Sequence, residues 1–219
     1  RGRDHADPGG AAAVRQGDRV AAALDHAAVI AQTQAWVKRV VIGLNLCPFA
    51  KAVLARGQIR YAVSDAAEPT SLLMALLEEL ELLARCDPAL TDTTLLIHPN
   101  ALVDFDAYNQ FLDAAEALLA DAGYEGVFQL ASFHPDYRFA DTAPEAVENA
   151  TNRSPFPMLH LLREASVARA VSAFPDAAEI FEANLRTLRA LGKDGLAALK
   201  AQCHADAQAG AAGEASNAA

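Results

Sequence analysis

Strand-like and helix-like segments alternate along this chain, and that alternation limits the folds it can adopt more than any other feature. Three short apolar segments have the character of strands, at 58–64, 93–98 and 127–134. A helix-forming segment separates each successive pair, at 69–86 and 104–122. Helical connections of this kind join strands that run in the same direction. The order predicts an α/β fold, with a small, mostly parallel sheet of three or four strands, helical crossovers and additional C-terminal helices.

A first helix is predicted before the strands. Apolar residues recur at helical spacing through 24–46, and Gly43 and Pro48 mark the end of the stripe. Trp36 lies on this stripe. We therefore assign Trp36 to the core of the protein rather than to a binding surface.

The ends of the chain differ from its centre. Residues 1–23 and 205–219 are rich in alanine, glycine and small polar residues and have no apolar stripe, so we expect disordered tails there. The segment 24–204 is predicted to be a single α/β domain. Its last part is expected to form helices at 176–192 and 194–203.

The composition indicates a globular protein with a sizeable core, because 53% of the residues are hydrophobic and 21% are charged. The formal net charge of −10 argues against a nucleic acid or an anionic membrane as the main partner. No apolar run approaches the roughly 20 residues of a membrane-spanning helix. The three cysteines form no CxxC pair, and no signal-peptide core is visible, so we expect a cytoplasmic protein without a disulfide framework.

Two of the expected strands end alike. LLIHPN at 95–100 and ASFHPD at 131–136 place His98 and His134 directly before a proline. Composition alone would give roughly 0.3 His-Pro pairs in such a chain. Proline ends a strand and keeps the preceding residue extended, so strands of one direction would bring both histidines to the carboxyl edge of the sheet, where α/β sheets bind ligands. The alternative is two ordinary hydrogen-bonded histidines beside strand-ending prolines.

A helix start is predicted within TNRSPFPMLHLLRE at 151–164. Ser154 is a favoured N-cap, and Pro155 suits the first helical position. The free N–H groups of such a helix end, with Asn152 and Arg153 beside them, can receive a phosphate or carboxylate. We therefore expect Asn152, Arg153 and Ser154 to bind a small anionic ligand, unless the arginine simply lies in solvent.

Two more candidate residues follow from local context. On the predicted helix, His160 and Glu164 are four residues apart and would share one face, either in a site or as an ordinary surface pair. Cys47 stands in GLNLCPFA, between a helix end and Pro48. It is either a buried, inert cysteine or a metal ligand or nucleophile, and a nucleophile would need a nearby histidine.

These residues together suggest a metal site. His98, His134, His160 and Asp136 would supply three or four ligands suited to zinc or iron. Their spacing matches no known metal motif, and the chain has no Walker loop, GxGxxG or GxSxG sequence.

The resulting hypothesis is a metal-dependent enzyme that acts on a small anionic molecule. Glu164 would orient His160 or move protons. Two alternatives stay open. One is a metal-free enzyme with Cys47 as nucleophile and a histidine as base, and the other is a non-catalytic anion-binding or regulatory module. The reaction, the substrate and the oligomeric state are not specified by the sequence.

Four sequence blocks are similar to those of one protein family. VVIGLNLCPFA at 40–50, TTLLIHP at 93–99, FQLASFHPDYRF at 128–139 and NRSPFPMLHLLREAS at 152–166 resemble, in order and spacing, a bacterial family known as domain of unknown function 1415. The resemblance covers about 30–192. Because that family has no established activity, the resemblance implies neither a reaction nor the role of any residue.

Overall fold

A four-stranded sheet forms the centre of the protein. The computed structural model describes residues 24–173 and 177–217, and the tail predicted at 1–23 lies outside them. The strand order is β1-β2-β4-β3. The α/β class and the fourth strand are confirmed. The strands are β1 (Ile59–Val63), β2 (Thr93–Ile97), β3 (Phe128–Phe133) and β4 (Met158–Arg163).

The sheet is mixed, and the prediction of a mostly parallel sheet is corrected by β4. This strand lies between β2 and β3 and is antiparallel to both, whereas β1 and β2 are parallel. Its sequence, MLHLLR, was expected to be helical because methionine, leucine and arginine favour helices and six residues show no clear period. Pairing on both sides of the strand overrides that preference. β1, β2 and β3 still share one direction, as the crossovers required.

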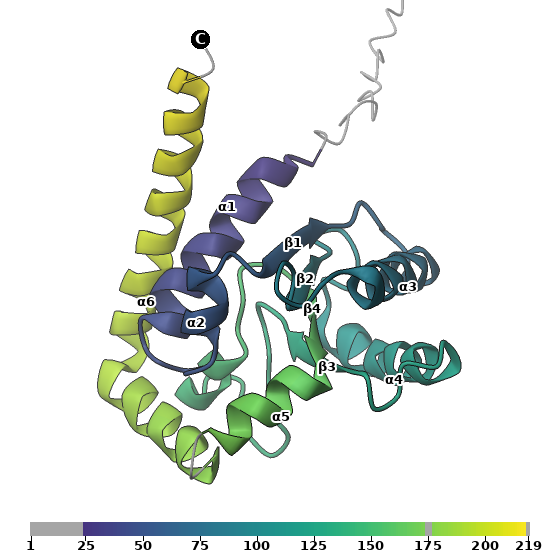
Figure 1. Ribbon diagram of the computed structural model, residues 1–219. Helices are drawn as coiled ribbons and strands as arrows, with labels where there is room; N and C mark the ends of the chain where they lie inside the picture. Colours follow the sequence, from purple (N-terminus) through teal and green to yellow (C-terminus); the bar gives the residue numbers. More distant parts are fainter. Residues whose placement is uncertain (1–23, 174–176, 218–219) are drawn as a thin grey trace, which may run out of the picture.

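Two helices cover one face of the sheet. They are α3 (Pro69–Arg85) and α4 (Phe105–Asp121), and they lie side by side (Figure 1). Leu72, Leu76 and Leu80 recur every four residues on α3 and are fully buried against the sheet and α4. Both helices agree with the helix-forming segments predicted at 69–86 and 104–122.

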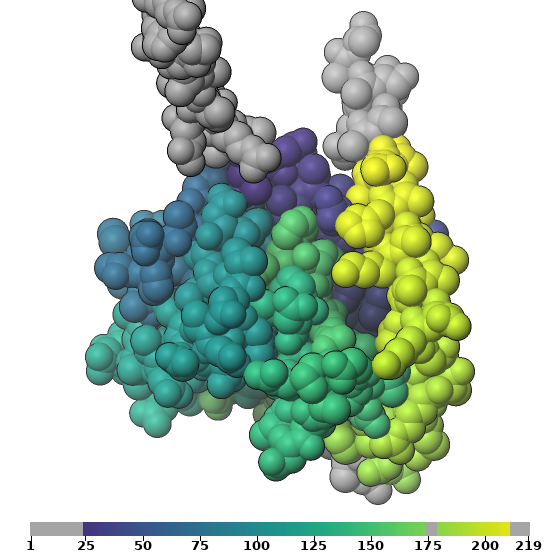
Figure 2. All heavy atoms as spheres, turned by 180° about the vertical axis from the view of Figure 1, so that it is seen from behind, coloured from purple at the N-terminus to yellow at the C-terminus, as the bar shows by residue number. Residues whose placement is uncertain are grey.

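The other face is covered by α1 (His26–Trp36), with α6 (Ala177–Asn217) packed along it (Figure 1). Figure 2 shows α6 as a ridge along one side of the molecule, with part of α1 visible beside it. The helix α1 continues as a π-helix, η1 (Val37–Ile42). Gly43 follows η1, and a Cβ there would collide with the carbonyl oxygen of Arg39, so this turn requires glycine.

The tail expected at 205–219 is helical through residue 217, as the C-terminal part of α6. Cys203 and Ala207 are buried, and Asp206 forms a bidentate ion pair with Arg39 of η1. The alanine-rich sequence has no broad apolar stripe. Alanine is nevertheless the strongest helix former, and small residues let α6 pack closely beside α1.

Three short elements complete the fold. They are α2 (Ala50–Ala55), the 3₁₀ helix η2 (Val147–Thr151) and α5 (Glu164–Ser172). In the part of the chain that the structure describes, no helix is both long and apolar enough to cross a membrane.

Candidate functional site

His98 and His134 lie at the same edge of the sheet, as predicted. Each directly follows a strand, β2 or β3, and those strands share one direction. Tyr108 of α4 joins them, because its ring centroid is 5.8 Å from that of His98 and 5.1 Å from that of His134. Both histidines are fully buried. The strand-ending His-Pro pairs therefore bring the two imidazoles onto one buried ring.

Tyr108 also joins two strands, β3 and β4, through its hydroxyl group. The hydroxyl donates to the carbonyl oxygen of Met158 (2.8 Å) and accepts from the backbone N–H of Phe133 (3.1 Å). Burial raises the pKa of this phenol, so it stays protonated and can make both bonds. The histidine–tyrosine group thus closes the ends of β3 and β4 against α4.

The ring nitrogens of His134 are both used by the backbone. Nε2 lies 3.2 Å from the carbonyl oxygen of Leu102, and Nδ1 accepts from the backbone N–H of Asp136 at 3.0 Å. His134 therefore carries its proton on Nε2. No ring nitrogen of His134 is left to bind a metal without breaking one of these bonds.

One ring nitrogen of His98 is likewise hydrogen-bonded to the backbone. Its Nδ1 lies 3.0 Å from the carbonyl oxygen of Ala101, while Nε2 is buried and has no partner among the described residues. Burial lowers the pKa of His98 to about 4 and also lowers that of His134, so both rings are neutral at pH 7.

His160 lies on the opposite face of the sheet. It is on β4, where side chains alternate, and its neighbours Leu159 and Leu161 belong to the core beneath α3 and α4. The side chain of Asp136 is exposed. The structure therefore does not bring His98, His134, His160 and Asp136 together. Among the described residues, no group of three or more His, Cys, Asp or Glu side chains could hold a metal ion.

The predicted anion site at 152–154 lacks the helix on which it depended, because the chain from Asn152 leads into β4. The three side chains instead hold the loop. Asn152 donates to the carbonyl oxygen of Ser132, and Ser154 donates to that of Phe156. Arg153 donates to two carbonyl oxygens, those of Tyr137 and Pro144.

Glu164 also differs from its predicted setting. It is the first residue of α5, whereas His160 is on the strand before it, so the two do not share a helix face. The backbone N–H of Glu164 donates to the carbonyl oxygen of Val127. The four-residue spacing was informative only if 155–171 were one helix.

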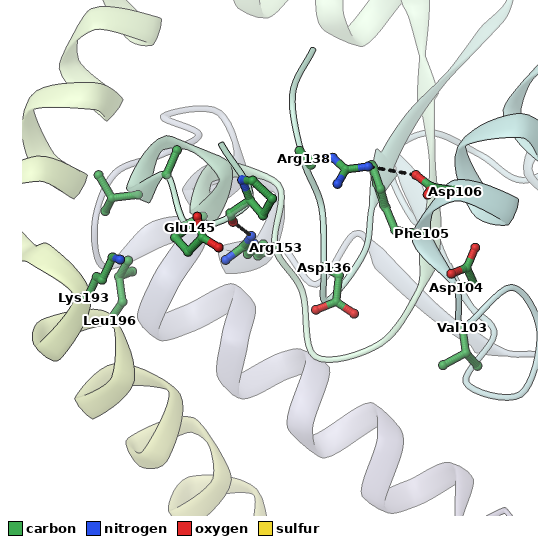
Figure 3. A pocket seen from close by; sticks show the side chains of 14 residues that line it. Val103, Asp104, Phe105, Asp106, Asp136, Arg138, Glu145, Arg153, Lys193 and Leu196 are labelled. Atoms are coloured by element: carbon green, nitrogen blue, oxygen red, sulfur yellow. Dashed lines mark hydrogen bonds and ion pairs between the residues drawn. The ribbon is translucent and has the colours of Figure 1, made fainter. Parts of the chain in front are cut away.

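Arg153 does line a cavity, which we call the loop pocket and which has a volume of about 700 Å³ (Figure 3). It lies between the start of α4, the loop after β3 and α6. Four carboxylates and three cationic side chains line it. Arg138 is paired with Asp106 at 2.9 Å, and Lys193 reaches the pocket from α6. The charged lining residues are Asp104, Asp106, Asp136, Arg138, Glu145, Arg153 and Lys193.

A second cavity, which we call the sheet pocket, has a volume of about 720 Å³ and lies on the sheet face opposite α3 and α4. Residues from all four strands line it, together with η1, α2 and α5. Its lining is mostly apolar. Cys47 and His160 both line this cavity, so the structure brings together two of the predicted site residues that are 113 positions apart (160 − 47 = 113).

On the strands that line the sheet pocket, two side chains and a backbone carbonyl form a short hydrogen-bond chain. The hydroxyl of Thr93 lies 2.7 Å from Nε2 of His160 and donates to the carbonyl oxygen of Leu161 at 2.6 Å. Because the single hydroxyl proton is used on that carbonyl, Nε2 of His160 must donate to Thr93. Burial lowers the pKa of His160 to about 4, so the ring is neutral and Nδ1 is its acceptor.

Several residues of the sheet pocket were not predicted as site residues. Trp36 is buried, as expected for a core residue, and it also lines the pocket. Thr93 is the first residue of β2, and in the corresponding predicted strand only His98 was a candidate site residue. Arg56 and Arg169 are exposed residues of the pocket lining. Nothing in the sequence indicates that α2 and α5 line one cavity on the same sheet face, so no signal could have grouped these residues.

Fold and cavity together define a mixed α/β protein with a small-molecule-sized pocket against its sheet. The family model described as "Protein of unknown function (DUF1415)" matches residues 28–198, and the chain belongs to this family. The resemblance seen in the four sequence blocks is thereby confirmed. No curated protein and no solved structure matches the chain.

Proposed function

We propose that the protein binds a small molecule with an apolar body and an anionic group in the sheet pocket. One observation carries the proposal: a cavity of about 720 Å³ with a mostly apolar lining, in which three arginines outnumber one aspartate, in a chain of net charge −10. Cavities of this size and character are typical of small-molecule sites. The apolar lining favours an apolar body, and the excess of cations favours an anionic group.

The two exposed arginines supply the charge at the opening of the sheet pocket. Arg56 donates to the side chain of Gln58, and Arg169 donates to the hydroxyl of Ser166. Neither forms an ion pair with a described carboxylate. The third arginine, Arg163, is held by backbone carbonyl oxygens and stacks on an aromatic ring, so we assign it a structural role.

The loop pocket supports an anionic ligand less well. Its carboxylates outnumber its cations. Arg138 is neutralised by Asp106, and both donor groups of Arg153 that form bonds are directed at backbone carbonyl oxygens. The anion expected from the sequence near Arg153 is therefore proposed for the sheet pocket instead.

Tryptophan fluorescence tests this function directly, because the chain contains one tryptophan and Trp36 lines the sheet pocket. Titration with octanoate should change the emission in a saturable manner. Butyrate lacks four methylene groups, each contributing about 0.8 kcal/mol when buried, and should bind more than about tenfold more weakly. Absence of a saturable response to octanoate would contradict the proposal.

Charge variants identify the anion site. The double change Arg56→Gln and Arg169→Gln should weaken octanoate about fivefold, which corresponds to about 1 kcal/mol for exposed charges. The same change should leave the affinity for uncharged octan-1-ol unaltered. Arg153→Gln is the matched control, since it removes one arginine from the loop pocket and should not alter octanoate binding.

A second candidate function is thiol chemistry on the bound molecule. The observation in its favour is that Cys47 and His160 line the same cavity, as a metal-free Cys/His enzyme requires. Alkylation by iodoacetamide at pH 6, followed by mass spectrometry, tests it. An activated Cys47 should react faster than Cys86, which is similarly half-buried, and octanoate should slow the reaction. Equal rates for the two cysteines would remove this candidate.

A further inference from the structure

Nδ1 of His160 is a polar atom of the sheet-pocket lining that has no hydrogen-bond partner within the described protein. It is the acceptor left when Nε2 of His160 donates to Thr93. Nε1 of Trp36 and Nε of Arg163 are also unpaired, but the protein encloses both atoms, so a molecule in the pocket does not reach them. Polar groups in a mostly apolar cavity are usually hydrogen-bonded, so the acceptor on His160 points to a donor supplied by a ligand.

The ring of His160 lies near two aromatic residues of the pocket lining. The Phe133 ring centroid is 6.1 Å from that of His160 and 5.4 Å from that of Trp36. His160 therefore belongs to the region of the pocket where β3 and β4 meet the end of α1.

The hydrogen-bond chain fixes the polarity of the histidine. The hydroxyl of Thr93 has one proton and gives it to the carbonyl oxygen of Leu161, so it can only accept from His160. Reversing the tautomer of His160 would place two acceptors against each other at 2.7 Å. The lowered pKa of His160, about 4, keeps the ring neutral at pH 7 and excludes a second N–H on Nδ1. His160 thus presents a fixed acceptor, and a ligand must bring a donor to it.

We infer that the molecule bound in the sheet pocket is a hydroxylated apolar carboxylate, whose hydroxyl group donates to Nδ1 of His160. A hydroxyl is a small neutral group that can donate this bond. This inference rests on the proposed function and specifies its ligand class. A site built to hydrogen-bond a hydroxyl discriminates strongly against an analogue that lacks it, because its own buried polar groups are then unpaired.

Calorimetric titration with octanoate and with 2-, 3- and 8-hydroxyoctanoate tests the inference. At least one hydroxylated compound should bind more than about tenfold tighter than octanoate. His160→Phe keeps an aromatic ring and removes the acceptor, so the preference should vanish while octanoate affinity is retained. Thr93→Val should also reduce the preference, because the histidine tautomer is no longer fixed.

Thr94→Val is the matched control. Thr94 is the next residue of the same strand and faces the other side of the sheet; it is fully buried, and its hydroxyl has no partner among the described residues. The change removes the same atoms without touching the pocket, and the preference for the hydroxylated compound should persist.

Nitrogen-15 NMR of the histidine rings gives a readout that needs no substitution. His160 should be neutral with its proton on Nε2, and the Nδ1 signal should shift when the preferred hydroxyoctanoate is added but not when octanoate is added. This measurement and Thr93→Val decide the matter if His160→Phe does not fold.

The outcomes separate the two proposals. If octanoate binds and none of the hydroxylated compounds binds tighter, the inference is wrong and the proposed function stands. If His160→Phe keeps the full preference, the inference is also wrong. If none of the carboxylates binds, the proposed function fails, and the inference fails with it.

Discussion

Acidification between pH 7.5 and pH 5.0 should destabilise this protein through its buried histidines. Burial lowers the pKa of His98 and of His160 to about 4, against about 6.5 in an unfolded chain. As the pH falls below 6.5, the unfolded chain binds protons that the native protein does not bind. The free energy of unfolding must therefore fall with pH, in a window that ends near pH 4, where the native histidines are protonated too.

The magnitude follows from proton linkage. Each histidine contributes a slope of up to about 1.4 kcal/mol per pH unit within the window, so between pH 6.5 and pH 5.0 each lowers the free energy of unfolding by about 2 kcal/mol. Together they account for about 4 kcal/mol. That is a large fraction of the roughly 5–15 kcal/mol that stabilises a typical domain. His134, whose pKa is also lowered by burial, changes stability in the same direction.

Urea unfolding followed by circular dichroism at pH 7.5 and pH 5.0 measures this effect. His98→Asn keeps a donor near the carbonyl oxygen of Ala101, and His160→Gln keeps a donor near Thr93, yet neither replacement titrates. Each variant should lose about half of the pH dependence, whatever its stability at pH 7.5. His204→Gln, on the exposed side of α6, should retain it. A wild-type stability that is unchanged between the two pH values would refute the reasoning.

Three further changes test other parts of the structure. Tyr108→Phe should lower the free energy of unfolding, measured with urea, by about 2–3 kcal/mol, because Met158 and Phe133 lose a buried partner. Tyr124→Phe is the control and should cost little, since the hydroxyl of Tyr124 makes no bond to the described residues. Gly43→Ala should lower the free energy of unfolding by about 1–3 kcal/mol, because the added Cβ collides with the carbonyl oxygen of Arg39. Gly210→Ala in α6 is the control and should be near-neutral, since nothing lies within 4 Å of the added Cβ. His134→Ala should leave the zinc and iron content, measured by elemental analysis, equal to that of the wild type, because both ring nitrogens serve the backbone; a loss of bound metal would contradict this assignment.

Much of the architecture follows from local sequence signals. The strands β1, β2 and β3, and the helices α3 and α4 between them, agree with the predicted segments because their apolar periodicity and end signals are strong. The edge shared by His98 and His134 followed from strand direction alone. In each case the information lies within a few neighbouring residues.

The strand β4 could not be predicted in this way. MLHLLR is a good helical sequence, and it becomes a strand because it fits between β2 and β3, whose own positions depend on distant parts of the chain. Every expectation built on that helix then changed, including the anion site at 152–154 and the pairing of His160 with Glu164. The histidines themselves were candidates for good reason, but a sheet separates two of them from the third.

The sheet pocket also depends on tertiary structure. Cys47 and His160 were each singled out, and only the packing of α2 and α5 over the sheet places them in one cavity. Trp36 was assigned to the core and Thr93 was not a candidate, and the side chains of both are indeed buried. Pockets of this kind are lined mainly by such residues, so composition and periodicity do not distinguish them from the rest of the core.

The central claim is that the sheet pocket holds the apolar body of a small anion, and intermolecular nuclear Overhauser effects test it most directly. With octanoate in slight excess over the protein, the methylene protons should show contacts to the ring protons of Trp36 and Phe133 and to the methyl groups of Leu95, all of which line the sheet pocket. Contacts to Val103 and Leu196 instead would place the ligand in the loop pocket, and that result would contradict the account.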